Sequence, residues 1–215
     1  MHRMYPRYHL ACVLLLDKSG SMSGKPMDTL NQALFEFKKM CNAKCIDRYE
    51  LMIDLCIISF GGRGSIGGEP DIEILQSFAP TNEVFYDKPL IANETTPLAE
   101  AVERGLKEIA GIKEIYKHND IEYLRPWLIC LTDGESTEDE AYYNSVKESL
   151  KKAVNDKHVF ADGIAIGDAG NYKKLTDFFG EKNTYRFEDH MNAGGFERIL
   201  ESHYRQWCYE NDMPR

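Results

Sequence analysis

Residues 10–21 read LACVLLLDKSGS: an unbroken apolar run, then a carboxylate and two hydroxyls at alternate positions. The apolar run has the length and character of a buried strand. In an extended chain alternate residues point the same way, so Asp17, Ser19 and Ser21 are predicted to present their oxygens to one spot. Gly20 allows the chain to turn there at little steric cost.

Short β-rich apolar runs alternate with longer segments of helical period along the chain. The runs are Tyr8–Leu16, Leu51–Phe60, Ile72–Phe78, Trp127–Thr132, Val159–Ile166 and Thr184–Phe187. This alternation predicts an α/β fold with a doubly wound, mostly parallel six-stranded sheet and helices on both faces. Because a glycine-rich stretch and no crossover helix separates Phe60 from Ile72, those two strands are predicted to pair antiparallel at one edge.

Five segments have the apolar spacing of amphipathic helices. They lie at Pro26–Cys41, from Pro97 to about Gly111, from Thr137 to Ala153, near Tyr172–Phe179 and near Phe196–Trp207. Thr96 is placed to cap the first turn of the second helix. Thr137 and Glu140 have the spacing of a capping box for the third helix.

The composition limits the kinds of partner. The chain has 215 residues and a formal net charge of −9. No cluster of Lys or Arg is long enough to follow a phosphate backbone, so we expect neither nucleic acid nor an anionic membrane as a partner. No stretch reaches the roughly 20 apolar residues of a membrane helix, and no signal peptide is evident. We therefore expect a cytoplasmic protein with a single domain over residues 1–215 and a core from about 8 to 207.

The six cysteines do not indicate a disulfide framework, because the chain has neither the small size nor the secreted character of such proteins. Cys12, Cys56 and Cys130 lie inside apolar runs and are predicted to be core residues. Cys41 and Cys45 are four residues apart near a helix end, but no second Cys or His pair has metal-ligand spacing relative to them. Zinc is therefore disfavoured.

A second carboxylate follows the central apolar run, at Asp133-Gly134. In an open α/β sheet the carboxyl edge binds ligands, particularly where strand order reverses. Mg²⁺ takes oxygen ligands and accepts one or two carboxylates, so Asp17 and Asp133 predict a cation site at this edge. Asp and Ser are also common in turns. Thr96 taken by itself is more often a helix cap than a metal ligand, and it can be both.

These residues resemble the metal-ion-dependent adhesion site of von Willebrand factor A domains. The family pattern is Asp-x-Ser-x-Ser, then a Thr before a helix, then an Asp that closes a strand. It is matched here, in order, by Asp17, Ser19, Ser21, Thr96 and Asp133. The resemblance extends over roughly residues 8–207 and implies the doubly wound fold of that family.

The resemblance also implies a role for each residue. Ser19, Ser21 and Thr96 would be direct ligands of Mg²⁺, for which Mn²⁺ or Ca²⁺ could substitute. Asp17 and Asp133 would act mainly through bound water. An acidic residue of a partner protein would fill the open position on the metal, so the chain would be a binding module and not an enzyme.

Two further stretches refine the resemblance. Asp17–Pro26 and Arg125–Trp127 are similar to stand-alone bacterial members associated with tellurite-resistance and stress gene clusters, which implies a kinase, phosphatase or ATPase encoded nearby as the partner. One departure is Asn93-Glu94-Thr95, where many relatives have glycines. Whether Glu94 or Thr95 contributes to the metal stays open.

Two motifs that invite a nucleotide-binding interpretation are rejected. The glycines of Gly62–Gly67 match a dinucleotide fingerprint, but Pro70 and a strand follow where the phosphate-binding helix should begin. The segment Gly20–Pro26 is one residue short of a phosphate loop and has Pro where Ser or Thr is required.

The alternatives to a binding module are a Mg²⁺-dependent phosphoester hydrolase and a scaffold with a vestigial metal site. A phosphatase with an aspartyl nucleophile usually has a second Asp two residues further on, where this chain has Ser19. His118, His158 and His190 have no Ser or Cys motif beside them and are predicted to be solvated surface. The acidic run Glu135–Glu140 is expected to complement a helix macrodipole.

Overall fold

The computed structural model describes residues 7–42, 46, 49–61, 72–83, 85–86, 88–92, 96–134, 136–167, 172–191 and 194–213. Within these residues one sheet contains the strands β1 (Tyr8–Asp17), β2 (Leu51–Phe60), β3 (Ile72–Pro80), β4 (Trp127–Thr132), β5 (Phe160–Ala165) and β6 (Thr184–Arg186). Their order across the sheet is β3-β2-β1-β4-β5-β6. Neighbouring strands are parallel except β2 and β3, which are antiparallel. The predicted fold class and its antiparallel edge strand are confirmed.

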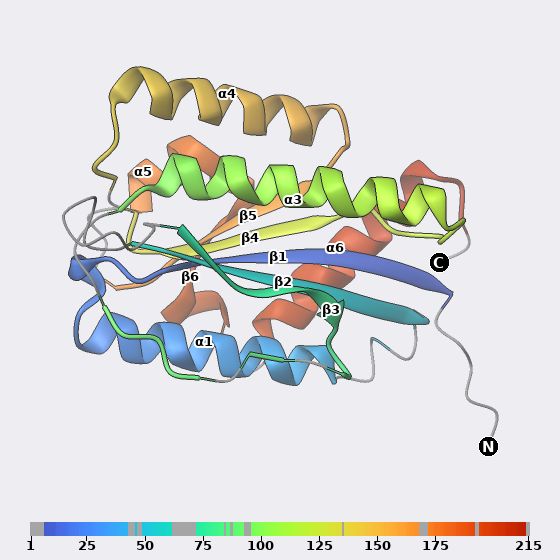
Figure 1. The fold of residues 1–215 in the computed structure, drawn as a ribbon, viewed down its shortest axis with the longest axis horizontal. Helices are drawn as coiled ribbons and strands as arrows, with labels where there is room; N and C mark the ends of the chain where they lie inside the picture. The colour runs from blue at the N-terminus through green and yellow to red at the C-terminus, as the bar shows by residue number, and fades with distance from the viewer. Residues whose placement is uncertain are drawn as a thin grey trace.

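The helices cover both faces of this sheet (Figure 1). They are α1 (Lys25–Cys41), α3 (Leu98–His118), α4 (Glu140–Asn155), α5 (Tyr172–Phe179) and α6 (Gly195–Glu210). Helices α3, α4 and α5 lie on one face, and α1 and α6 lie on the other. Three short turns complete the described elements: η1 (Gly20–Met22), η3 (Glu181–Asn183) and η4 (Phe187–Met191).

The central strands are apolar on both sides because both sides are covered. In β1, Cys12 and Leu14 pack into the core layer of α1 and α6, whereas Val13 and Leu15 pack into the layer of α3, α4 and α5. Such burial on both faces explains why these strands read as continuous apolar runs rather than alternating ones. The predicted core cysteines Cys12, Cys56 and Cys130 are all fully buried, which confirms their assignment to the core.

Helix α3 is longer than the sequence predicts. The expected end near Gly111 is wrong, since the helix continues to His118. A glycine inside a helix costs about 1 kcal/mol relative to alanine. Here the next turns continue the apolar stripe, and Tyr116 is almost completely buried, so packing outweighs that cost.

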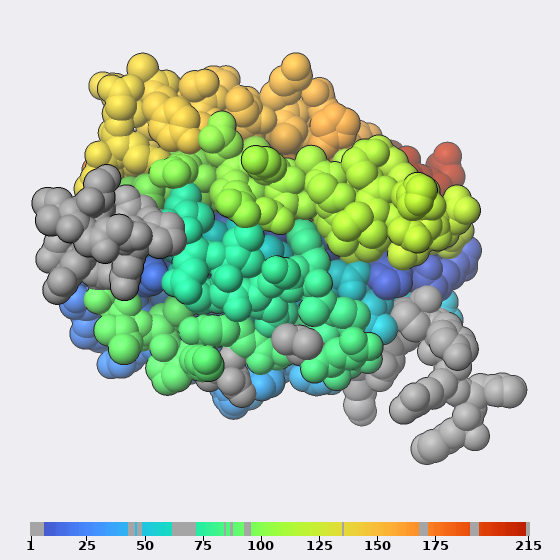
Figure 2. Space-filling model, in the orientation of Figure 1, coloured from blue at the N-terminus to red at the C-terminus, as the bar shows by residue number. Residues whose placement is uncertain are grey.

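The segment after β3 carries the chain from the sheet edge along α1. The backbone N–H of Tyr86 donates to Oε1 of Gln76 in β3, and the backbone N–H of Leu90 donates to Oδ1 of Asn31 in α1. Figure 2 shows this segment and β3, in teal and green, on the surface between α3 and α1. The path returns the chain to the carboxyl edge of the parallel strands, where α3 begins.

The strand order reverses between β1 and β4. After β1 the chain adds β2 and β3 on one side, then crosses to β4 on the other side. Leu16 lies opposite Leu131 in the β1–β4 register, so Asp17 and Asp133 follow these residues at the same edge of the sheet. This position is the usual ligand site of a doubly wound sheet. Of the helices that the structure describes, none combines the length and apolar character needed to cross a membrane.

Candidate metal centre

Asp17 ends β1 as a fully buried carboxylate with both oxygens engaged. Its Oδ1 accepts a hydrogen bond from the backbone N–H of Ser19 at 2.8 Å, and its Oδ2 accepts one from Oγ1 of Thr132 at 2.5 Å. Thr132 is the last residue of β4, so this second bond joins the ends of the two strands that flank the switch point. The carboxylate is therefore held in one orientation beneath the loop that follows β1.

Burial raises the pKa of Asp17 from 3.8 to about 7, although hydrogen bonds from Ser19 and Thr132 lower it and the nearby charge of Asp133 raises it further. A buried carboxylate is costly to ionise without a positive charge close to it. A bound cation at this edge would supply that charge and favour the ionised form of Asp17.

Ser19 and Ser21 bring their hydroxyl oxygens to 3.1 Å from each other. The expected extended backbone is wrong at Ser21, because Gly20–Met22 form a 3₁₀ turn that is closed by a bond from the N–H of Met22 to the carbonyl of Ser19. The turn nevertheless brings the two hydroxyls together. Neighbouring ligands of an octahedral Mg²⁺ with metal–oxygen distances of about 2.0–2.1 Å lie about 2.9 Å apart. The observed separation fits two adjacent ligand positions.

The loop after β4 is tied to the same centre through Thr132. The Thr132 hydroxyl donates to Asp17 and accepts a hydrogen bond from the backbone N–H of Gly134 at 3.0 Å. Gly134 has φ of 84°, a conformation that favours glycine. Asp133 stands between these two residues and is half-buried. The Thr-Asp-Gly sequence thus turns the chain sharply at the strand end, with Asp133 beside the buried Asp17 carboxylate.

Thr96 is buried and joined to the β4–α4 loop. Its backbone N–H donates to Oγ1 of Thr137 at 3.3 Å, and its carbonyl accepts from the N–H of Thr137 at 3.2 Å. The predicted capping role of Thr96 is wrong, because Pro97 is the N-cap residue and its side chain makes no cap bond. Instead, the Glu138 carboxylate accepts from the backbone N–H groups of Ala99 and Glu100.

The predicted capping box of α4 is also wrong. The N-cap is Asp139, whose Oδ1 accepts from the N–H groups of Ala141 and Tyr142. Thr137 is turned toward Thr96 and is not available to cap α4. The acidic run therefore serves two different helices, since Glu138 caps α3 and Asp139 caps α4.

At the carboxyl edge the structure joins three of the five predicted site residues, Asp17, Ser19 and Ser21, through hydrogen bonds. Asp133 directly follows Thr132, which donates to Asp17, and its charge acts on the Asp17 carboxyl group. Thr96 is connected to this arrangement through Thr137, a residue of the same loop as Asp133. Asn93-Glu94-Thr95 and Glu135 lie outside the described residues, as do Gly62–Gly67 and Cys45.

Sequence reasoning missed three residues of this arrangement: Thr132, Thr137 and Glu138. Thr132 reads as one more strand residue, and the other two read as helix-start signals. Among the described residues, no three His, Cys, Asp or Glu side chains are grouped so as to hold a metal ion. His118 and His158 are exposed, which agrees with their prediction as surface residues, and the side chain of His190 lies outside the described part.

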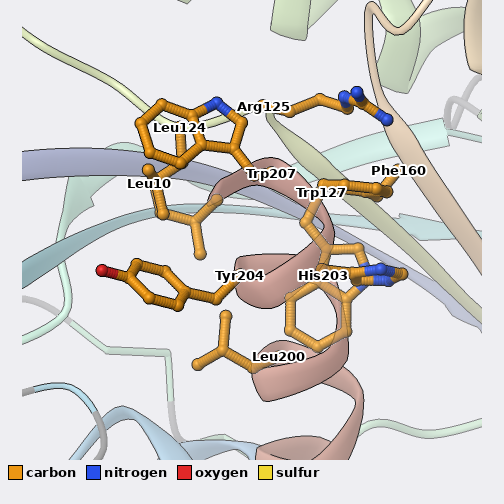
Figure 3. A pocket seen from close by; sticks show the side chains of 9 residues that line it. All are labelled: Leu10, Leu124, Arg125, Trp127, Phe160, Leu200, His203, Tyr204 and Trp207. Carbon is orange, nitrogen blue, oxygen red and sulfur yellow. The ribbon is translucent and has the colours of Figure 1, made fainter. Parts of the chain in front are cut away.

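A small pocket lies at the opposite, amino edge of the sheet, between α6 and the starts of β4 and β5 (Figure 3). Its lining is mainly apolar, and His203 and Trp127 lie side by side in it. Nε1 of Trp127 donates to Oδ2 of Asp162 at 2.6 Å, and Nε2 of His203 lies 2.7 Å from the same oxygen. These bonds attach α6 to the sheet, so we assign the cluster a structural role.

Neither a protein-family model nor a curated protein sequence matches this chain. Solved structures do match. Proximal thread matrix protein 1 from the mussel byssus is 15% identical with a TM-score of 0.56, over 94% of this chain and 46% of that chain. Its form with a zinc-occupied MIDAS motif (metal-ion-dependent adhesion site) is 14% identical with a TM-score of 0.58, over 91% and 46%. The manganese-loaded TRAP protein of Plasmodium vivax is 16% identical with a TM-score of 0.51, over 85% and 69%.

These likenesses concern the fold. The sheet order, the antiparallel edge strand and the helices on both faces give this chain the Rossmann-like α/β fold of a von Willebrand factor A domain. The chain spans less than half the length of the mussel protein that it matches.

Proposed function

We propose that this chain is a Mg²⁺-dependent protein-interaction module, an adaptor or scaffold rather than an enzyme. In this proposal Ser19, Ser21 and Thr96 bind the metal directly, and Asp17 and Asp133 support it through bound water. The observation that carries the proposal is the 3.1 Å separation of the Ser19 and Ser21 hydroxyls next to the buried Asp17 carboxylate. The zinc and manganese named for the two similar structures support a divalent cation here, with Mn²⁺ or Ca²⁺ as substitutes for Mg²⁺.

The donor set determines what the metal would do. Hydroxyl ligands are neutral, so they leave the positive charge of the cation largely uncompensated at its open position. A carboxylate of another protein is the natural group to fill that position. We propose an acidic residue of a partner as the ligand, with a kinase, phosphatase or ATPase of a bacterial tellurite-resistance or stress system as the class of partner. We further propose a cytoplasmic location and one domain over residues 1–215.

Hydrolysis of phosphate esters is the less favoured alternative. Asp17 has both carboxylate oxygens engaged in hydrogen bonds and is completely buried, which is unsuitable for a nucleophile. Ser19 stands where a phosphatase of this kind would have its acid and base. Turnover of phosphate monoesters or nucleotides by the Mg²⁺-loaded protein would reverse this preference.

The test of the proposed function compares the wild type with Ser19→Ala and Ser23→Ala. Ser23 is exposed and follows the metal-binding triplet without belonging to it, so it is a matched control. We expect wild type and Ser23→Ala to retain a partner from cell lysate in Mg²⁺ and to release it in chelator, and Ser19→Ala not to retain it. Retention by Ser19→Ala, or retention that is unchanged by chelator, would contradict a metal-dependent interaction.

A further inference from the structure

We propose that Thr137 and Glu138 are positioning residues for the metal centre, which they serve by fixing Thr96 and the start of α3 against the β4–α4 loop. This inference rests on the proposed metal site. It assigns a role to two residues that lie outside the five residues of the proposed metal site and come from a different part of the chain than Thr96.

Thr137 forms hydrogen bonds with both the N–H and the carbonyl of Thr96. Its Oγ1 accepts from the N–H of Thr96 at 3.3 Å, and its own N–H donates to the carbonyl of Thr96 at 3.2 Å. The carbonyl of Thr96 also accepts from the N–H of Leu98 in the first turn of α3. The position of the Thr96 backbone, from which its hydroxyl projects, is thus set by a residue of the β4–α4 loop.

Glu138 fixes the first turn of α3 immediately after Thr96. Its Oε2 accepts from the N–H of Ala99 at 2.7 Å and its Oε1 from the N–H of Glu100 at 2.8 Å. The Ser136 hydroxyl donates to the same carboxylate at 2.9 Å. Since these bonds use both carboxylate oxygens, the side chain is held by α3 on one side and by its own loop on the other.

The charge of Glu138 has a second effect on a cation site. The amino end of an α-helix carries a partial positive charge of about half an elementary charge, concentrated in the first turn. Helix α3 begins two residues after Thr96, so its positive end lies next to a proposed metal ligand. A carboxylate bonded to the first-turn N–H groups of Ala99 and Glu100 offsets that charge, and its loss would disfavour a cation nearby.

Thr137 and Glu138 also join two parts of the proposed metal site to each other. Thr96 and Asp133 come from different loops, and hydrogen bonds of Thr137 and Glu138 make those loops one unit. Residues that orient metal ligands typically change metal affinity by about 10- to 100-fold when they are replaced. We therefore expect replacement of either residue to weaken metal binding without removing a ligand.

The experiment measures the dissociation constant for Mn²⁺ and, in chelator, the thermal midpoint of four variants and the wild type. Thr137→Val removes the acceptor for the Thr96 N–H at nearly constant shape, and Thr137→Ser restores it. Glu138→Gln removes the charge and one of the two acceptor oxygens. Asp139→Asn is the matched control, because this neighbouring carboxylate caps α4, which carries no proposed ligand.

We expect Thr137→Val and Glu138→Gln to weaken Mn²⁺ binding about tenfold or more, and Thr137→Ser and Asp139→Asn to stay within about twofold of wild type. Glu138→Gln and Asp139→Asn should both lower the thermal midpoint slightly, since each removes a negative charge from the start of a helix. Wild-type affinity in Thr137→Val and Glu138→Gln would overturn this inference and leave the metal site intact. Equal weakening by Asp139→Asn would show a loss of general stability and would also overturn it. Absence of Mn²⁺ binding by the wild type would overturn the proposed function and this inference together.

Discussion

At the scale of single residues, Asp17 sets the balance between stability and metal binding. Its carboxylate is fully buried and accepts hydrogen bonds from Ser19 and Thr132. We predict that Asp17→Asn raises the free energy of unfolding of the metal-free protein by about 1 kcal/mol, because it removes a buried charge at a site where function and stability are expected to conflict. The amide keeps an acceptor for the Ser19 N–H, and its nitrogen can donate to the Thr132 hydroxyl, which donates to the carboxylate in the wild type. The substitution thus removes the buried charge and keeps a bond at each position. Chemical denaturation in chelator measures the change, and a variant less stable than wild type would contradict it.

The raised pKa of Asp17 predicts that the free energy of unfolding depends on pH. Because the pKa of Asp17 is raised to about 7 from an ordinary value of 3.8, the folded protein binds this proton more tightly than the unfolded chain does. The stabilisation is complete below the ordinary value and is lost as the pH rises toward 7. The free energy of unfolding of Asp17→Asn minus that of wild type, measured without metal, should therefore grow between pH 5 and pH 7.5. A difference that is constant over this range would contradict the burial of an ionising carboxylate.

At the scale of secondary-structure elements, the strands could be predicted almost completely from the sequence. Each predicted strand agrees with the structure to within two residues at either end, because strands buried on both faces, such as β1, consist of local apolar runs. The residues that cap α3 and α4 could not be predicted equally well. The cap of α3 comes from Glu138, far away in the sequence, and no local pattern at Pro97 indicates it.

The candidate site likewise has residues that the sequence pattern predicts and residues that it does not. Asp17, Ser19 and Ser21 are close in sequence, so their spacing predicts that they converge, although a 3₁₀ turn and not an extended chain brings the hydroxyls together. The contributions of Thr132 and Thr137 depend on which loops the fold places side by side. A spacing rule contains no information about such contacts.

Helix α6 gives a prediction at the same scale. Asp162 is buried and accepts from Nε1 of Trp127 while contacting Nε2 of His203. We predict that Asp162→Ala lowers the free energy of unfolding by about 3 kcal/mol, because two buried polar groups lose their partner. Urea unfolding measures the loss. Arg205→Ala on the exposed side of α6 is the control and should change stability by less than about 0.5 kcal/mol. A loss below about 1 kcal/mol for Asp162→Ala would contradict the role of this cluster in attaching α6.

At the scale of the whole molecule, the proposed metal links loops from both sides of the switch point. Occupancy should therefore stabilise the folded state, by about 2.7 kcal/mol when the metal is at 100 times its dissociation constant. We predict that Mg²⁺ raises the thermal midpoint of wild type and of Ser23→Ala in a concentration-dependent way, and does not raise that of Ser19→Ala. Scanning calorimetry with and without Mg²⁺ measures this, and equal shifts in all three proteins would place the bound metal elsewhere.

The fold itself is a general scaffold, and what distinguishes this molecule is the edge where β1 and β4 end. The buried Asp17 carboxylate and two adjacent hydroxyls meet at the point of strand-order reversal, where the charge of Asp133 also acts on Asp17. The start of α3 is bonded to the loop that follows β4. Fold alone does not determine function, so the account depends on whether this edge holds a cation.

The most direct test is a titration of the purified protein with Mn²⁺, followed by electron paramagnetic resonance, with Asp17→Ala measured in parallel. We predict one saturable site in the wild type that is lost or strongly weakened in Asp17→Ala. Absence of binding by the wild type, or equal binding by both proteins, would contradict a metal centre formed by Asp17, Ser19, Ser21, Thr96 and Asp133.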